Sequence, residues 1–351
     1  MDKKNLTTIF RTLQSLIILL IIPSFLQAQT GGESTFSFLE LKYSAKTASL
    51  AGTNISAFDQ DINSIFDNPA ILDSNLNRHF ALNYTDYISD INYGMISYAH
   101  HLKNIGTFAI SLNYMNYGSF KESDETGIIT GDFNASDYVL SVVYANSLTE
   151  NIQYGFNLKT IYSEYYIVNS FGLSVDAGII YHNSNGFNSA IVIRNLGSQI
   201  KPYTEGNYEA LPFDVQLGFS QKLKHAPFRF LAQIHHLNNW SLQYDSPLIE
   251  GNEIDSMKTM RKIGNELLHH INIGAEINPL NNFYLRVSYD FQKMLDLAID
   301  DKKGMVGFSF GVGLKLYKFH ISYARSIYHL AGKTNTFSIT SNLREFYKKS
   351  I

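Results

Sequence analysis

The feature that most constrains this chain is a strict two-residue alternation of apolar with small or polar side chains. It is cleanest at residues 306–316, where every second residue is Val, Phe or Leu and the residues between them are Gly, Ser and Lys. Successive side chains of a β-strand point to opposite faces, so this segment predicts a strand with one wholly apolar face. We count about fourteen such segments from residue 79 to residue 339. The chain is therefore predicted to be all-β.

The connections between these segments alternate in length from the second onward, although the first, residues 87–90, is short on the long-loop side and residues 163–170 are intermediate in length. The short ones are residues 101–104, 146–151, 183–186, 223–226, 279–282 and 317–318, and the long ones are residues 118–136, 196–212, 237–268 and 292–303. Outer-membrane barrels have short turns at one rim and long loops at the other. A closed sheet also leaves no backbone donor unpaired in lipid. The sequence therefore predicts that residues 76–351 form a transmembrane antiparallel β-barrel of about fourteen strands.

The first residues, 1–28, have the pattern of a cleaved secretory signal peptide. Lys3 and Lys4 give a basic start, residues 16–22 form a short apolar core, and Ala28 precedes the expected cleavage site. An uncleaved anchor helix is a weaker interpretation, because the apolar core is short. We expect export to the outer membrane of a Gram-negative bacterium, with the long loops toward the cell surface.

Charge and cysteine content exclude several classes of function. The full chain carries 28 Lys and Arg against 31 Asp and Glu. Removal of residues 1–28 would leave 25 and 30, a net charge of −5. A mildly acidic surface argues against nucleic acid as a partner. The chain has no cysteine, so it has no disulfide, no thiolate metal site and no thiol nucleophile.

Residues 29–75 differ from the rest of the chain, because residues 35–72 show little alternation and mix small with polar side chains. We expect short helical turns that form a plug inside the barrel. The side chains singled out in this plug are Asp59, Asp67, Asn68 and Pro69. Room for it would come from the lumen-side glycines Gly172, Gly178, Gly218, Gly274, Gly307, Gly311 and Gly313.

Asp59 and Asp61 begin like a calcium-binding EF-hand loop. The sixth and twelfth positions of such a loop need Gly and Glu, but the chain has Ser64 and Ala70 there. These carboxylates are therefore predicted to cap turns of the plug.

The face of each strand opposite the lipid is expected to line the lumen with largely small or polar side chains. Examples are Ser174, Asp176, Arg286, Ser288 and Asp290. Arg325 departs from the pattern, since it shares the parity of Ile321 and Tyr323 and so faces lipid unless it lies at the outer rim.

Histidine pairs occur at His100-His101, His235-His236 and His269-His270. Adjacent residues of a strand point to opposite faces, so neither member of a pair is expected to help the other bind a metal. The sequence lacks the His-Glu-x-x-His motif of metalloproteases. It matches Gly-x-Ser-x-Gly at residues 307–311, but inside a predicted strand and not at a strand-to-helix turn, and it matches Ser-x-x-Lys at residues 198–201, in a predicted connection. We therefore expect no catalytic residue, no metal and no cofactor, and a protein that is not an enzyme.

The longest connection, residues 238–268, is either mobile surface or a docking element. It contains the only Trp of the chain, and aromatic residues are enriched at protein interfaces. Long loops are often functional. The candidate partner-binding residues are Trp240, Tyr244, Leu248, Ile249 and Met257.

Two stretches of sequence resemble a known family. The first is TFSFLELKYSAKTASLAGTNISAFDQDINSIFDNPAIL at residues 35–72, in which Asn68-Pro69-Ala70 matches an Asn-Pro-Ala element of the wider FadL-like superfamily. The second is HHINIGAEINPLNNFYLRVSYDFQK with GFSFGVGLKLYKFHISYARSIYHLAGKTNTFSIT. Together they resemble the PorV/PorQ family of outer-membrane proteins, and the C-terminal half is most similar to the PorQ branch.

This resemblance implies a part in the type IX secretion system. It implies a non-enzymatic barrel that anchors PorZ-like and PorU-like proteins of the cell-surface attachment complex, in contact with outer-membrane lipid and lipopolysaccharide. Two alternatives remain open at this point. One is FadL-like transport of hydrophobic compounds, and the other is a PorV-like shuttle for secreted cargo.

Overall fold

The computed structural model describes residues 34–242, 264–280, 282–297, 304–328 and 332–347. No helix among these residues is long and apolar enough to cross a membrane. The candidate residues Tyr244, Leu248, Ile249 and Met257 lie outside the described residues, as does the expected signal peptide.

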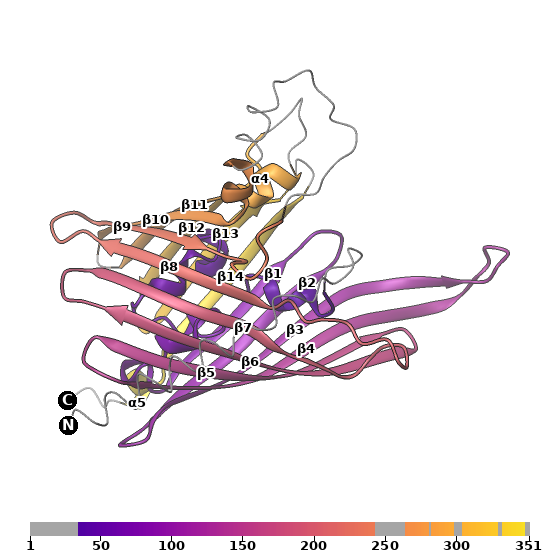
Figure 1. The fold of residues 1–351 in the computed structure, drawn as a ribbon, viewed down its shortest axis with the longest axis horizontal. Helices are drawn as coiled ribbons and strands as arrows, with labels where there is room; N and C mark the ends of the chain where they lie inside the picture. The colour runs from indigo at the N-terminus through magenta and orange to yellow at the C-terminus, as the bar shows by residue number, and fades with distance from the viewer. Residues whose placement is uncertain (1–33, 243–263, 281, 298–303, 329–331, 348–351) are drawn as a thin grey trace. The chain divides into compact units, whose positions relative to one another are not determined.

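Fourteen antiparallel strands close into a barrel in which each strand pairs with its neighbours in sequence, and β1 pairs with β14 (Figure 1). The predicted barrel and its number of strands are confirmed. The strands are β1 (His79–Asp86), β2 (Asn92–Leu102), β3 (Gly106–Ser123), β4 (Ile129–Ser147), β5 (Ile152–Tyr165), β6 (Val168–His182), β7 (Phe187–Lys201), β8 (Asp214–Lys222), β9 (Phe228–Ile234), β10 (Ile271–Leu280), β11 (Phe283–Asp290), β12 (Phe308–Leu316), β13 (Phe319–Ile327) and β14 (Lys333–Asn342).

A short helical segment precedes the barrel, as predicted. Residues 34–77, which we call the inner segment, form one α-helix and five single turns of 3₁₀-helix. These elements are η2 (Ser37–Glu40), α2 (Ala45–Ser49), η3 (Thr53–Ser56), η4 (Ile62–Ser64), η5 (Pro69–Ile71) and η6 (Ser74–Leu76). Helices at the rims of the barrel include α4 (Phe291–Leu297) and α5 (Arg344–Tyr347).

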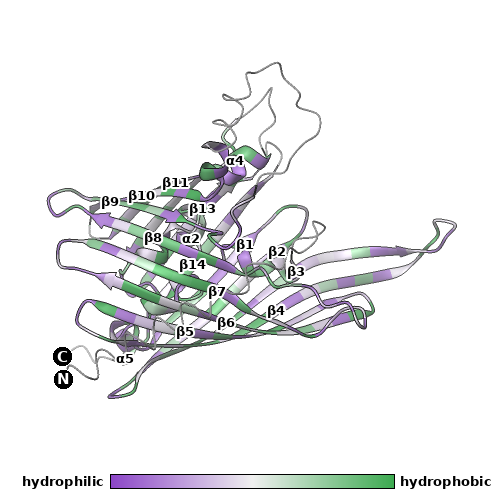
Figure 2. Cartoon of the chain, viewed as in Figure 1, coloured by the Kyte–Doolittle hydropathy of each residue, from purple (hydrophilic) through white to green (hydrophobic). Residues whose placement is uncertain are grey.

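Hydrophobic and hydrophilic residues alternate along the strands (Figure 2). Most of the large apolar side chains of the strands are exposed on the outer face. Near the rim with the long connections, the register places six aromatic side chains at one level of neighbouring strands. This outer aromatic row consists of Tyr84, Tyr114, Tyr138, Tyr162, Tyr323 and Phe337. Aromatic rings concentrate at the interface between lipid and water. The row therefore marks the outer edge of the band that contacts lipid.

Residues 118–136, which the sequence analysis interpreted as a long loop, are instead a continuation of β3 and β4. The two strands pair as far as Ser123 and Ile129, beyond the last pairing of β3 with β2 at Asn116. The result is a two-stranded hairpin that extends past the neighbouring strands (Figure 1). The interpretation was wrong because the hairpin has no lipid on one side, and so its sequence does not need one apolar face.

Candidate functional site

The interior of the barrel is occupied by the inner segment, which we take as the candidate site (Figure 1). Six wall glycines make room for it, because a Cβ at each would meet atoms of the inner segment. The pairs are Gly155 with Pro69 and Ala70, Gly172 with Phe36, Gly178 with Asn68, Gly218 with Ile55, Gly274 with Thr53, and Gly311 with Ser49. Five of the seven lumen-side glycines singled out from the sequence therefore border the inner segment, as expected. Gly313 instead faces other wall residues, and Gly307 faces Asp290 and Met294 of α4.

Asn68 and Pro69 build a turn at the centre of this packing. Asn68 is an N-cap, since its Oδ1 accepts a hydrogen bond from Ala70 N at 2.9 Å. Pro69 occupies the first position of η5, where its missing N–H is not needed. The other side of the Asn68 amide donates to Ile55 O at 2.7 Å. The side chain therefore joins two turns of the inner segment to each other.

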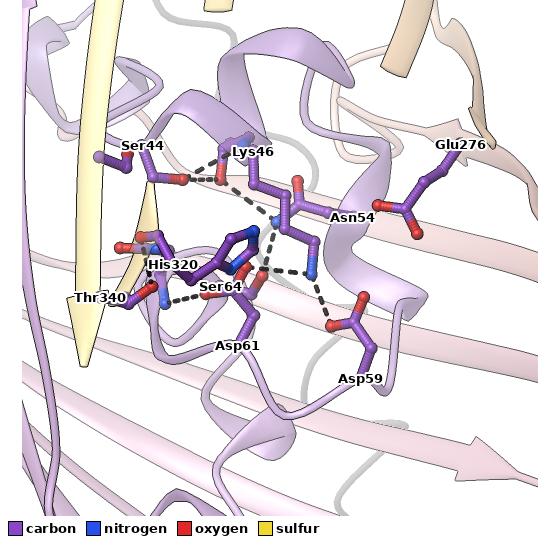
Figure 3. Close-up of polar contacts among 12 residues, drawn as sticks. Ser44, Lys46, Asn54, Asp59, Asp61, Ser64, Glu276, His320 and Thr340 are labelled. Atoms are coloured by element: carbon purple, nitrogen blue, oxygen red, sulfur yellow. Dashed lines mark hydrogen bonds and ion pairs between the residues drawn. The ribbon is translucent and has the colours of Figure 1, made fainter. Parts of the chain in front are cut away.

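A group of six charged residues joins the inner segment to strands β9, β10 and β11. We call it the Asp59 network; it consists of Lys46, Asp59, Asp61, Arg229, Glu276 and Arg286. Lys46 Nζ lies 2.5 Å from Asp59 Oδ1 and 3.5 Å from Asp61 Oδ2 (Figure 3). Three positive charges face three negative ones, so the network is neutral as a whole.

The wall contributes Arg229, Glu276 and Arg286 to this network. Arg229 Nη1 lies 2.5 Å from Asp59 Oδ2 and 3.3 Å from Glu276 Oε1. Arg286 Nε lies 2.7 Å from the other oxygen of Glu276. A buried charge is stable only when it is paired, so these contacts fix the inner segment against one side of the wall.

The ionisation of Asp59 follows from these neighbours. Burial by itself raises the pKa of the Asp59 carboxyl. The ammonium of Lys46 and the guanidinium of Arg229 outweigh the burial and hold the pKa of Asp59 below its ordinary value. Asp59 is therefore a carboxylate over the whole range of physiological pH.

A second charged group joins the inner segment to strands β5, β6 and β7. We call it the Asp67 network; it consists of Asp67, Lys159, Asp176, Arg194 and Asn195. Lys159 Nζ lies 2.7 Å from Asp176 Oδ2 and donates to Asn195 Oδ1 at 2.9 Å. Arg194 Nη1 lies 4.0 Å from Asp67 Oδ1.

Phe66 packs beneath the two cations of the Asp67 network. Lys159 Nζ lies 4.4 Å from the centre of the Phe66 ring, and the guanidinium carbon of Arg194 lies 5.8 Å from it. Cations over an aromatic face attract it, the more so when both are buried. Each carboxylate of both networks has a cation beside it, so these residues hold the inner segment in place.

Strand β7 leaves its partner β8 where the Asp67 network meets the wall. Their pairing ends at Arg194 and Asp214, and Asn195 has a left-handed backbone with φ of 57°. The pairing of β7 with β6 also shifts register here, which marks a bulge at residues 194–195. Past this bulge, β7 contacts the connection that follows it instead of β8. Asn195 Nδ2 donates to Pro212 O at 2.8 Å, and Thr35 N of the inner segment donates to Ala210 O at 2.8 Å.

The lumen contains an apolar cluster that the sequence analysis did not expect. We call it the inner aromatic cluster; its buried members are Phe36, Phe38, Leu39, Tyr43, Phe66, Tyr93, Met95, Met115, Val139, Ile161 and Leu211. Five come from the inner segment, and five are inward-facing residues of strands β2 to β5. The expectation of a largely small or polar lumen is therefore wrong for this side of the wall. The inner segment is itself apolar there, so apolar wall residues are buried against it.

Two of the three histidine pairs come together, contrary to the argument from strand geometry. His235 Nδ1 lies 2.7 Å from His236 Nδ1, and His270 Nδ1 donates to His235 O at 2.8 Å. Adjacent side chains do not point apart here because His235 and His236 lie past the end of β9, where His236 has φ of 54°. In the described part of the chain, no group of three or more His, Asp or Glu side chains is placed to hold a metal ion.

Of the candidate partner-binding residues, only Trp240 is described. Its side chain is 56% exposed. The indole stacks on the His270 ring, with 5.0 Å between ring centres. Trp240 thus lies at the rim of the long connections and is held by one of the histidines there.

The extended β3–β4 hairpin and Tyr166, in the turn between β5 and β6, present a second exposed apolar surface at the same rim. We call it the hairpin patch; it consists of Phe120, Ile128, Ile129, Phe133 and Tyr166. The ring of Phe133 packs between those of Phe120 and Tyr166, with centres 5.2 and 4.9 Å apart. Ile128 is 65% exposed. These side chains lie past the outer aromatic row and hence outside the lipid band.

Sequence reasoning missed most of the residues that hold the inner segment. Asp59 and Asp67 were singled out, but Lys46, Lys159 and Arg229 were not. The alternation along the strands could have identified two of them. Lys159 and Arg229 occupy inward-facing positions of strands whose other face is apolar. An inward-facing charge in a membrane barrel needs a partner. The inner segment supplies Asp59 to Arg229, whereas the wall supplies Asp176 to Lys159.

Comparison with solved structures supports the same fold. The chain is similar to the Ralstonia pickettii toluene transporter TbuX, with a TM-score of 0.51 and 11% identity over 86% of this chain and 98% of that one. It is also similar to the Pseudomonas putida toluene transporter TodX, with a TM-score of 0.50 and 14% identity over 85% of this chain and 96% of that one. No family model matches the sequence, and no curated protein matches it.

The closed sheet, the outward apolar face and the internal N-terminal segment define the class of the protein. It is an outer-membrane β-barrel of fourteen strands. In particular, it has the fold of TbuX and TodX, at an identity that establishes the fold alone.

Proposed function

We propose that this protein is a non-enzymatic outer-membrane anchor for proteins of the cell surface. Its role would be that of the PorQ branch, which holds PorZ-like and PorU-like proteins of the type IX secretion attachment complex. The observation that carries the proposal is the filled interior. The Asp59 and Asp67 networks fix the inner segment to different parts of the wall, which suits a rigid scaffold more than a conduit.

The docking face in this proposal is the rim with the long connections. The hairpin patch and Trp240 are exposed there. Apolar side chains grouped in water beyond the lipid band are typical of protein interaction sites. Tyr244, Leu248, Ile249 and Met257 lie outside the described residues and stay predicted docking residues.

The test is a pull-down of the full tagged chain from detergent-solubilised outer membranes, with mass spectrometry of the captured proteins. A variant with Phe120→Ser and Ile129→Ser removes two apolar side chains of the hairpin patch. Truncation of interface hot spots costs 2 kcal/mol or more, so capture of the surface proteins should fall about 30-fold. Heat-modifiable migration in gels checks that the barrel remains folded.

A matched control changes apolar side chains at the opposite rim. Leu148 and Tyr317 are exposed in short turns there, so Leu148→Ser with Tyr317→Ser should leave capture unchanged. Equal capture by the patch variant and the wild type would refute docking at the hairpin. Capture of secreted cargo without PorZ-like proteins would instead support a PorV-like shuttle.

A second function is the passage of hydrophobic compounds across the outer membrane. It is favoured by the inner aromatic cluster, which would offer an apolar path if the inner segment moved aside. The comparisons support this function more directly than the first, since TbuX and TodX are toluene transporters. Uptake of toluene by vesicles that contain the purified protein tests it; uptake no faster than into empty vesicles would exclude it.

A further inference from the structure

Arg325 is the one outward-facing residue of β13 that the alternation did not explain. Its side chain is exposed on the outer face of the wall. In the register it lies between Phe310 of β12 and Asn335 of β14. Tyr323, two residues earlier on the same face, belongs to the outer aromatic row. Arg325 therefore lies just outside that row, at the level of the lipid headgroups.

No acidic side chain among the described residues forms an ion pair with Arg325. Asp86 is the acidic residue at the same level of the barrel. It pairs with Asn335 of β14 and therefore lies two strands away from Arg325. Asn335 itself accepts a hydrogen bond from Tyr323 Oη at 2.8 Å. The guanidinium is thus available to an anion from outside the protein.

An apolar depression of about 420 Å³ adjoins Arg325 on the outer face of strands β10 to β13. Its lining includes Ile277, Leu285, Val287, Phe310 and Val312. All five occupy outward-facing positions of their strands. The surface thus places a hollow for apolar chains inside the lipid band and a cation at its outer end.

We propose that this surface binds a phosphate-bearing acylated lipid of the outer leaflet. An acyl chain occupies the depression, and the phosphate accepts hydrogen bonds from the Arg325 guanidinium. Arginine suits phosphate because its planar fork can donate two hydrogen bonds at once. At headgroup depth an outward Arg costs little, about 0–1 kcal/mol, against several times more at the midplane. From the middle of the lipid band outward, the surface has first the apolar depression and then the cation. A phosphate-bearing acylated lipid has its acyl chains and its phosphate in the same order.

The test uses the full chain purified in detergent, titrated with bisphosphorylated lipid A and followed by native mass spectrometry. Arg325→Gln removes the charge and should weaken lipid binding about tenfold, the effect of one charge-assisted contact. Val312→Trp fills the depression and should weaken binding to a similar extent. Arg325→Lys keeps the charge and should bind more tightly than Arg325→Gln.

The matched control is Arg344→Gln in α5, which removes an exposed arginine at the opposite rim and should leave binding unchanged. Binding by Arg325→Gln as tight as by the wild type would overturn the proposal. So would an equal loss in Arg344→Gln, because that result would mean diffuse attraction between lipid and basic residues. Wild-type binding of dephosphorylated lipid A as tight as that of the phosphorylated form would overturn the role of the phosphate. None of these outcomes depends on capture of surface proteins, so the proposed function and this site fail separately.

Discussion

Arg229 of the wall and Asp59 of the inner segment lie 2.5 Å apart, from Nη1 to Oδ2. The other oxygen of Asp59 lies 2.5 Å from the ammonium of Lys46 in the inner segment itself. One carboxylate thus receives a cation from the barrel and a cation from the segment inside it. Because the Arg229 and Lys46 side chains are almost fully buried, the attraction between them and Asp59 is weakly screened by water.

Removal of Arg229 should therefore loosen the inner segment. Arg229→Met leaves Glu276 and Asp59 each with one cation fewer, and breaking a buried pair in this way costs about 3–5 kcal/mol. We expect faster cleavage of the inner segment in limited proteolysis while the barrel stays heat-modifiable. Lys121→Met is the control, since Lys121 and Asp132 form an ion pair whose side chains are 66% and 54% exposed and such pairs contribute about 0–1 kcal/mol. Equal protection of the two variants would contradict the anchoring role of Arg229.

Acid should loosen the same segment. The pKa of Asp59 is lowered in the folded protein, despite its burial, by Lys46 and Arg229. Its contribution to stability is then complete above the ordinary Asp pKa of about 3.9 and is lost as the pH falls below it toward the folded value. Cleavage by pepsin, which is active in acid, should rise over this window. Asp59→Asn should already be less protected at neutral pH and should show a smaller change on acidification; an unchanged pH profile would argue against Asp59 as the titrating group.

The close packing of the Pro69 turn against Gly155 can be tested by adding a methyl group at Gly155. A Cβ at Gly155 would lie 2.5 Å from the carbonyl carbon of Pro69 and 2.7 Å from Ala70 N, which are backbone atoms. Gly155→Ala should therefore destabilise the packed segment by about 1–3 kcal/mol, as overpacking does. Gly264→Ala is the matched control because no atom of the described residues lies within 4 Å of a Cβ added there. Similar melting of both variants in thermal unfolding would show that the turn adjusts freely.

A substitution of Phe66 distinguishes between the two proposed functions. Its ring is buried, lies 5.3 Å from that of Tyr43, and faces Lys159. Phe66→Ala should cost about 3–5 kcal/mol and leave a cavity in the inner aromatic cluster. If the protein is an anchor, capture of surface proteins persists and vesicles gain no uptake of toluene. Faster toluene uptake by this variant than by the wild type would support the passage of hydrophobic compounds instead.

The strands and their inward and outward faces could be predicted from the sequence, because each residue that contacts lipid must be apolar independently of the others. An outward position such as Val312 must be apolar whatever its neighbours are, so the alternation is visible without the fold. Beyond the lipid this constraint ends, which is why the β3–β4 hairpin was taken for a loop. The histidine pairs were misjudged for a related reason, since strand geometry does not hold past the end of β9.

The sequence by itself determined an antiparallel barrel of about fourteen strands and a distinct N-terminal segment beside a glycine-rich lumen. Only the tertiary structure decided which charges meet. Lys46 and Arg229 are 183 positions apart in the chain and share one carboxylate only because the barrel closes around the inner segment. A buried charge pairs with whichever opposite charge lies close to it in space, and a local sequence pattern does not specify that distance. For the same reason, the hollow beside Arg325 exists only once β10 to β13 stand side by side.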